Sequence, residues 1–188
     1  MRHFSRTLVL PLALAVIGGM SASPAPLAAQ GLMAEMHSDV GEVQKKLIDL
    51  ANAIPESAYG WRPGPGVRTI GELFKHVSAD NYLIPIMMGA PAPSASGISA
   101  TDMKSVGVYE SRTATKAQIV SELEASFAHL HGAMRLTTDT NLSEMLKFFG
   151  QDMSRQKVML LTVTHLHEHL GQGIAYARSN NVVPPWSK

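Results

Sequence analysis

The sequence contains no cysteine among its 188 residues. Disulfides therefore cannot stabilise the chain, even in a compartment that permits them, and a metal site in it cannot use thiolate ligands. Its stability must come from a packed core. The chain beyond residue 29 is long enough for one domain with a single core, and no internal repeat divides it.

An excess of charge of one sign is also missing. The sequence has 16 lysines and arginines against 15 aspartates and glutamates, and the two signs are mixed along the chain. Nucleic-acid binding normally requires a basic patch or stripe, so we expect no nucleic-acid partner. The sequence likewise shows no glycine-rich phosphate loop, no Ser-His-Asp arrangement and no nucleotide-binding motif.

The N-terminal apolar run is too short for a transmembrane helix. It covers residues 8–17, whereas a bilayer requires roughly 20 apolar residues. Basic residues precede it, Arg2 and Arg6, and small residues follow it, which is typical of a secretory signal with cleavage before Gln30. We therefore predict a signal peptide at residues 1–29, an exported protein that is periplasmic or secreted, and no membrane span after cleavage. An uncleaved N-terminal anchor is the alternative.

Residues 30–188 are typical of one all-α domain, with almost no strand signal. Apolar residues recur at spacings of three and four, as on the buried stripe of a bundle helix. Two capping boxes open helices, Thr69 with Glu72 and Thr115 with Gln118. The predicted helices cover residues 36–54, 69–89, 115–134 and 154–180. We expect them to form a four-helix bundle.

Two of the connections between these helices have unusual features. The connection between the second and third helices exceeds 20 residues and begins with the Pro- and Ser-rich residues 90–97. Such a long connection is unusual inside a compact domain, so it indicates a functional flap or a crossover of the bundle. A short apolar piece, residues 145–149, precedes the last helix.

Histidines on the last predicted helix have the spacing of metal ligands. His165 and His169 are four residues apart, so they share one helix face with β-carbons about 5–6 Å apart. Both imidazoles can then reach one divalent ion at about 2.0–2.1 Å. His167 lies about 200° around the helix from each of them and should point away.

A third histidine lies on the inward stripe of the second helix. His76 would complete three neutral imidazoles from two facing helices, the open geometry of a catalytic metal site. Each histidine also has a simpler interpretation. An inward histidine can be a hydrogen-bonded core residue, and a pair at this spacing arises by chance in a chain with eight histidines. Spacing alone leaves both interpretations open.

The chain resembles the DinB/YfiT-like family of metal-dependent proteins from about Met33 to Pro185. The matching pieces are Arg62-Pro63, residues 68–73 leading to His76, the segment from His165 to Gln172, and residues 180–185. The resemblance implies a four-helix bundle in which His76, His165 and His169 are the metal ligands. The family commonly places a basic residue after the last ligand, where this chain has Leu170, so the substrate should differ or be absent.

Other polar residues near these positions are weaker candidates. Glu72 and Asp80 flank His76 by one turn on either side, so each either hydrogen-bonds a ligand from outside or is a solvated helix charge. Gln172 and Tyr176 either line the cavity or cap the end of the bundle. The remaining residues, all expected at the surface or in solvent, are Glu168, His37, His129 and His131.

Two functions fit these observations. The first is a divalent-metal-dependent enzyme acting on a small molecule, for which the resemblance suggests hydrolysis or thiol transfer. Export weakens thiol transfer, because low-molecular-weight thiols are kept reduced inside the cell. The second is a non-catalytic metal-binding or structural helical bundle. Zinc, nickel and iron all suit imidazole, with zinc slightly favoured, and the sequence leaves a homodimer open.

Overall fold

The computed structural model describes residues 31–187, so the predicted signal peptide lies outside the described residues. The described chain is mostly helical, with one short hairpin. Its helices are α1 (Leu32–Ala53), α2 (Ile70–Met87), α3 (Lys104–Glu110), α4 (Lys116–Met134) and α5 (Arg155–Ser179). The strands are β1 (Met145–Phe148) and β2 (Gln151–Ser154), and short 3-10 turns cover Glu56–Ala58, Ser94–Ser96 and Pro185–Ser187.

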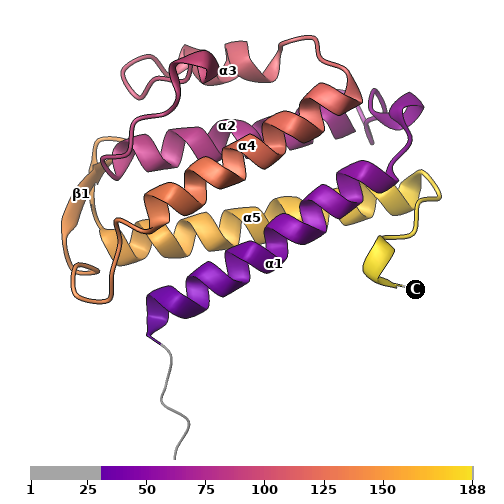
Figure 1. Cartoon of the computed structure of the whole chain (residues 1–188). Helices are drawn as coiled ribbons and strands as arrows, with labels where there is room; N and C mark the ends of the chain where they lie inside the picture. Colours follow the sequence, from indigo (N-terminus) through magenta and orange to yellow (C-terminus); the bar gives the residue numbers. More distant parts are fainter. Residues whose placement is uncertain (1–30, 188) are drawn as a thin grey trace, which may run out of the picture.

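The four long helices α1, α2, α4 and α5 form the predicted four-helix bundle (Figure 1). Helix α1 packs along α5, and α2 packs along α4. The apolar stripe of α1 is buried as expected, with Val40, Leu47 and Leu50 at 0% exposure. Each such side chain contributes about 1.5–3 kcal/mol on burial. Within the described residues, every helix is too short or too polar to cross a membrane.

The predicted helix ends agree with the structure. Both capping boxes form completely: Thr69 accepts from the backbone of Glu72, and Thr115 accepts from that of Gln118. The backbone N–H of each threonine in turn donates to the side chain of its partner, Glu72 or Gln118. Two free backbone N–H groups are therefore satisfied at the start of each helix. At the other end, Asn181 stands just beyond α5 with φ +60°, the left-handed conformation that asparagine tolerates after a helix.

The long connection is ordered and adds a fifth helix that the sequence did not predict. Helix α3 lies outside the bundle against α2 (Figure 1). Tyr109 anchors it, because this side chain is 2% exposed and packs with Tyr82 and Leu83 of α2. Lys75 also donates to the carbonyl oxygen of Arg112 at 2.7 Å. The connection is therefore a crossover fixed to the bundle.

The apolar piece at residues 145–149 supplies the first strand of a short hairpin, which the sequence did not predict in this mostly helical domain. Its strands are four residues each, and Phe148 pairs with Gln151 across the turn. Phe149 and Gly150 form the turn with φ values of 49° and 79°, as a two-residue hairpin turn requires. These short strands bury only Phe148, so their sequence lacks the alternating apolar pattern by which a strand is recognised.

Candidate metal centre

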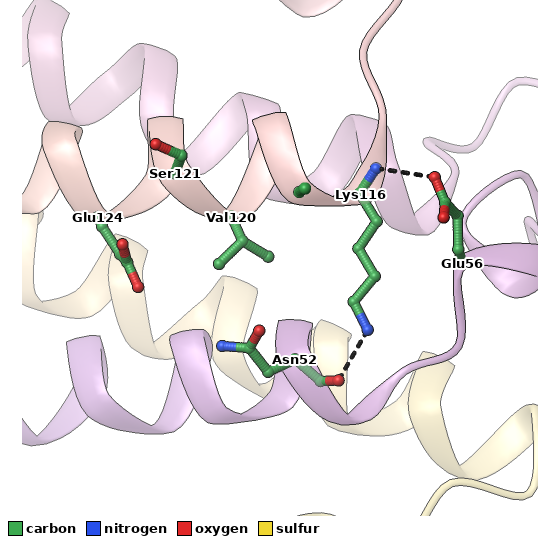
Figure 2. A pocket seen from close by; sticks show the side chains of 7 residues that line it. Asn52, Glu56, Lys116, Val120, Ser121 and Glu124 are labelled. Carbon is green, nitrogen blue, oxygen red and sulfur yellow. Dashed lines mark hydrogen bonds between the residues drawn. The ribbon is translucent and has the colours of Figure 1, made fainter.

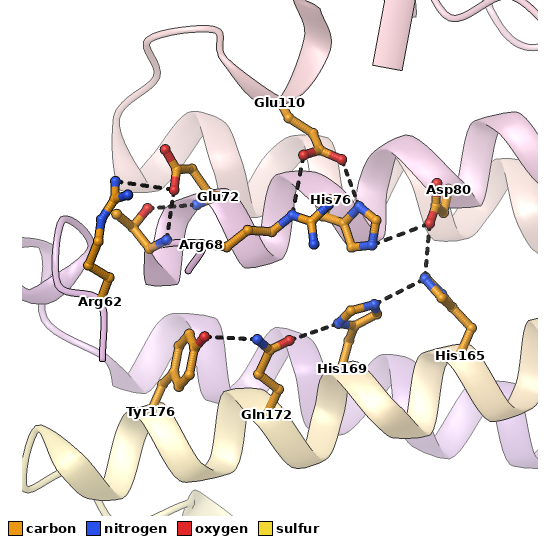
Figure 3. A network of polar contacts seen from close by, with 11 residues as sticks. Arg62, Arg68, Glu72, His76, Asp80, Glu110, His165, His169, Gln172 and Tyr176 are labelled. Atoms are coloured by element: carbon orange, nitrogen blue, oxygen red, sulfur yellow. Dashed lines mark hydrogen bonds and ion pairs between the residues drawn. The ribbon is translucent and has the colours of Figure 1, made fainter. Parts of the chain in front are cut away.

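His76, His165 and His169 meet between α2 and α5 (Figure 3). The ring of His76 lies 5.3 Å from that of His165 and 4.6 Å from that of His169, between centroids. The Nε2 atoms of His165 and His169 are 3.0 Å apart. One ligand nitrogen from each histidine lies within 4.8 Å of the others. The structure thus brings the three predicted residues together.

A glycine lets α5 approach its neighbours closely beside this cluster. Gly173 follows His169 by one helical turn, and a Cβ there would stand 3.2 Å from Leu50 and 3.6 Å from Leu73. The first of these distances is tighter than ordinary van der Waals contact. The glycine therefore lets α5 pack closely against α1, while its distance to Leu73 of α2 is an ordinary van der Waals contact.

Outer hydrogen bonds orient two of the three imidazole rings. His76 Nδ1 is 2.7 Å from Glu110 Oε1, and His169 Nδ1 is 3.0 Å from Gln172 Oε1. Gln172 in turn donates to the hydroxyl of Tyr176 at 2.8 Å. An Nδ1–H given to an outer acceptor leaves the Nε2 lone pair for a metal, which is how ligand histidines are usually fixed. The network appears in Figure 3.

Glu110 is a site residue that sequence reasoning missed. It is the last residue of α3, and Arg68 donates to its second oxygen at 3.3 Å. Burial acts to raise its pKa, but the hydrogen bond with His76 and the charges of His76 and Arg68 lower the pKa below its usual value. Since it is 34 positions from His76, no spacing rule connects them. The long connection was the only signal.

Asp80 faces the ligand nitrogens rather than the outer ones. Its Oδ2 atom lies 2.9 Å from His165 Nε2 and 3.4 Å from His76 Nε2. Burial acts to raise the pKa of Asp80, yet the hydrogen bond with His165 and the nearby histidine charges lower it overall. Asp80 is therefore an ionised group at the centre of the cluster, where it can bind a metal or accept a proton.

Glu72 does not reach the cluster. Its carboxylate accepts from the backbone N–H of Thr69 at 2.7 Å and from Arg62 at 3.4 Å. The backbone hydrogen bond is the main reason that its pKa is lowered. Of the two sequence interpretations, the structure supports a helix-end charge.

His169 is suited to be a neutral ligand. It is only 6% exposed, and burial lowers its pKa to about 4, with the charges of His165 and His76 acting in the same direction. Its bond with Gln172 opposes this shift without cancelling it. At neutral pH its nitrogen lone pair is therefore free of a proton, as metal binding requires.

The profile of the DinB superfamily matches residues 40–172 of the sequence. The chain belongs to the DinB superfamily. No curated protein matches it.

Solved structures share the fold of this DinB-family chain. A DinB-like protein from Bacillus cereus has a TM-score of 0.66 at 15% identity, over 81% of this chain and 95% of that one. YfiT from Bacillus subtilis, described as a probable metal-dependent hydrolase with an unusual four-helix bundle topology, has a TM-score of 0.60 at 15% identity, over 85% and 94%. A mycothiol-dependent maleylpyruvate isomerase has a TM-score of 0.58 at 15% identity, over 74% of this chain and 59% of that one.

The donor set of this DinB-family chain fits a divalent metal ion. Four ligands at about 2.0–2.1 Å in a tetrahedron lie roughly 3.4 Å from one another. The 3.0 Å between the Nε2 atoms of His165 and His169 and the limit of 4.8 Å for all three nitrogens lie around this value. Imidazole nitrogens with one carboxylate suit zinc, nickel and iron. His76, His165 and His169 could therefore hold such an ion.

Leu170, where the resemblance implied a basic residue, lies in the core. It is 6% exposed and belongs to the main apolar cluster. Its side chain is therefore accounted for by packing, and it contributes no charge to the site.

The remaining described histidines give one confirmed expectation and three corrections. His37, expected in solvent, is half-buried, and its ring stacks on that of His131 with centroids 6.3 Å apart. His167 is exposed and pairs with Asp39 at 2.9 Å, so it points away as predicted. His131, expected in solvent, is half-buried and lies 2.8 Å from Gln44. His129 is also half-buried, and its Nε2 atom finds no partner among the described residues. Burial lowers the pKa of both. Neighbouring helices cover these rings, which a stripe on one helix cannot indicate.

Proposed function

We propose that this protein is a divalent-metal-dependent enzyme, most simply a hydrolase, that acts on a small molecule. His76, His165 and His169 hold the ion, and zinc is preferred. The proposal depends on one observation, the two outer hydrogen bonds between the histidine rings and the oxygens of Glu110 and Gln172. They orient the rings of His76 and His169 so that the second nitrogen of each points toward one position. Core histidines without a ligand need no such convergence. The description of YfiT as a probable metal-dependent hydrolase agrees with it.

The chain's own residues divide the chemical work. A divalent ion in this site supplies Lewis-acid chemistry and activates water near neutral pH. Glu110 and Gln172 keep the rings of His76 and His169 in position. Asp80, an ionised carboxylate beside two ligand nitrogens, is placed to accept a proton as a general base.

Asp80 also supports a second candidate, a non-catalytic metal-binding bundle. Its oxygen lies close enough to His165 and His76 to serve as a fourth ligand. A site closed by four protein ligands is structural, whereas an open position marks a catalytic one. The proposed enzyme therefore requires that Asp80 leave one position of the ion open.

Activity against a panel of small uncharged esters, amides and lactones tests the proposal. We expect turnover after zinc is restored to chelator-treated protein, and none before. Asp80→Asn should lower kcat about 10²–10⁴-fold, the usual contribution of a general base, while zinc stays bound. If no panel member turns over and Asp80→Asn instead releases the zinc, the non-catalytic bundle is correct.

Export is part of the proposal and favours hydrolysis over thiol transfer. We infer export from the basic start and the apolar run of residues 8–17, which are followed by small residues. When the full chain is expressed in a bacterium, a form that begins at Gln30 should be found outside the cytoplasm. Recovery of an uncleaved cytoplasmic chain would restore thiol transfer as the stronger option.

A further inference from the structure

A small pocket opens directly beside the histidine cluster, and its walls are apolar. It has a volume of about 260 Å³ and lies between α2, α5 and the hairpin. Its apolar lining consists of Ile84, Leu161, Phe148 and Phe149. An apolar cavity of about 150 Å³ holds a benzene ring. The pocket is therefore large enough for one ring or a short branched chain with a small substituent.

The hairpin contributes the aromatic wall. The rings of Phe148 and Phe149 meet edge to face at 4.7 Å. Phe148 is buried, but Phe149 is 54% exposed. The exposed ring of Phe149 leaves apolar surface at the rim of the pocket, and covering apolar surface is favourable in water. A ring bound in the pocket would provide that cover.

The polar lining carries negative charge. It consists of Asp80, Thr164, His165 and Glu168, and no lysine or arginine is among the described residues that line the pocket. The hairpin's lysine, Lys147, is 2.8 Å from Asp152, so its charge is offset. Glu168 was expected to be a plain surface residue. It is exposed, but it lies one turn after Thr164 on the pocket side of α5.

We propose that this pocket binds the body of the substrate and selects small apolar molecules that are uncharged or positively charged. Carboxylates are rejected, because Asp80 and Glu168 both face the space that they would occupy. Glu168 is a specificity-determining residue, and Phe149 is the principal apolar contact. The proposal rests on the proposed function, since it takes the histidine cluster as the reacting end of the pocket.

Three probes with the same ring and different charge test the selection: benzyltrimethylammonium, benzyl alcohol and phenylacetate. Binding is measured by NMR titration of metal-free protein, because a carboxylate could ligate an ion directly. We expect the cation to bind about tenfold more tightly than phenylacetate, a difference of about 1.4 kcal/mol, because the carboxylates of Asp80 and Glu168 attract one charge and repel the other. Benzyl alcohol should fall between them.

Two variants separate charge from packing. Glu168→Gln should reduce the preference for the cation severalfold and leave benzyl alcohol binding unchanged. Phe149→Ala should weaken all three probes together. Glu124→Gln is the matched control, because Glu124 lines a different pocket between α1 and α4 (Figure 2), and it should change nothing.

Equal binding of phenylacetate and the cation, or unchanged binding in Phe149→Ala, would overturn the proposal. The outcome is independent of metal loading. Probe binding with the expected preference in a protein that never takes up zinc would remove the proposed function and leave the pocket's selectivity standing. Zinc uptake without probe selectivity would remove the pocket's proposed selectivity and leave the proposed function standing.

Discussion

Two pockets of this bundle show that size does not indicate function. The pocket between α1 and α4 has a volume of about 370 Å³, against about 260 Å³ for the pocket beside the histidines. In the larger one, Lys116 donates from Nζ to the carbonyl oxygens of Asn52 and Ile54, both at 2.8 Å. Figure 2 shows the bond to Asn52. These carbonyls belong to the end of α1, where a helix lacks internal partners. The lysine therefore acts as a helix cap.

The histidine cluster has the opposite arrangement. Its groups are held from outside by Glu110 and Gln172, while nitrogens and a carboxylate oxygen converge on one point (Figure 3). Three histidines close together, of which His169 is buried, do not contribute to stability as an apolar core would, and local disagreement with the rules of folding is expected at functional sites. In one pocket the polar groups satisfy each other, and in the other they are oriented toward a ligand.

The largest difference between the two regions should appear in metal affinity. Replacing His76, His165 or His169 by Ala should weaken zinc binding more than a hundredfold, beyond the 10–100-fold typical of outer residues, because each removes a ligand. Calorimetric titration with zinc measures the effect. His167→Ala and Lys116→Met are the controls and should bind as the wild type does. A loss confined to His167→Ala would mean that the helical phase is wrong.

The second largest difference between the two regions should appear in how the free energy of unfolding depends on pH. In metal-free protein, burial keeps the pKa of His169 near 4 against an ordinary value of 6.5. Between pH 6.5 and 4 the unfolded chain therefore binds more protons than the folded chain. As the pH is lowered through this window, the free energy of unfolding should fall by at most roughly 3 kcal/mol. Urea unfolding at several pH values measures it.

His169→Gln should reduce that slope, but His129 and His131, whose pKa burial also lowers, should keep part of it. Lys116→Met should leave it intact. The lowered pKa values of Asp80 and Glu110 act at lower pH. Their contribution is present above their ordinary values and is lost only as the pH falls through the folded values. A wild-type protein with constant stability from pH 6.5 to 4 contradicts the burial of a neutral His169.

The outer residues should have a smaller effect on the metal. Glu110→Gln keeps the shape of the side chain and removes its charge, so zinc affinity should fall about 10–100-fold. Zinc titration measures it, and Glu72→Gln is a matched control on the helix cap. Equal effects of the two changes would show a general charge effect instead of orientation of His76.

The smallest effect is expected from a substitution in the larger pocket, between α1 and α4. Lys116→Met should lower the free energy of unfolding by about 1 kcal/mol, the usual net value of such hydrogen bonds, with no change in zinc affinity. Urea unfolding and zinc titration on the same sample measure both quantities. Reduced zinc affinity in this variant would remove the distinction between the pockets.

The sequence predicted those features that depend on local spacing. Capping boxes and apolar stripes placed the four long helices, and the 3.6-residue period separated His167 from His165 and His169. It missed α3, which has seven residues, and the hairpin, which has strands of four residues each. Glu110 reaches His76 only because α3 crosses the bundle. Contacts of that kind depend on tertiary structure and leave no local pattern.

The central claim is that three histidines of this chain bind one divalent ion and leave it an open position. Elemental analysis of untagged protein, purified without added metal, combined with X-ray absorption at the edge of the metal found, tests this most directly. We predict one ion per chain, three imidazole ligands and at least one oxygen that exchanges with solvent. No metal at all, or a shell closed by four protein ligands, would contradict the account.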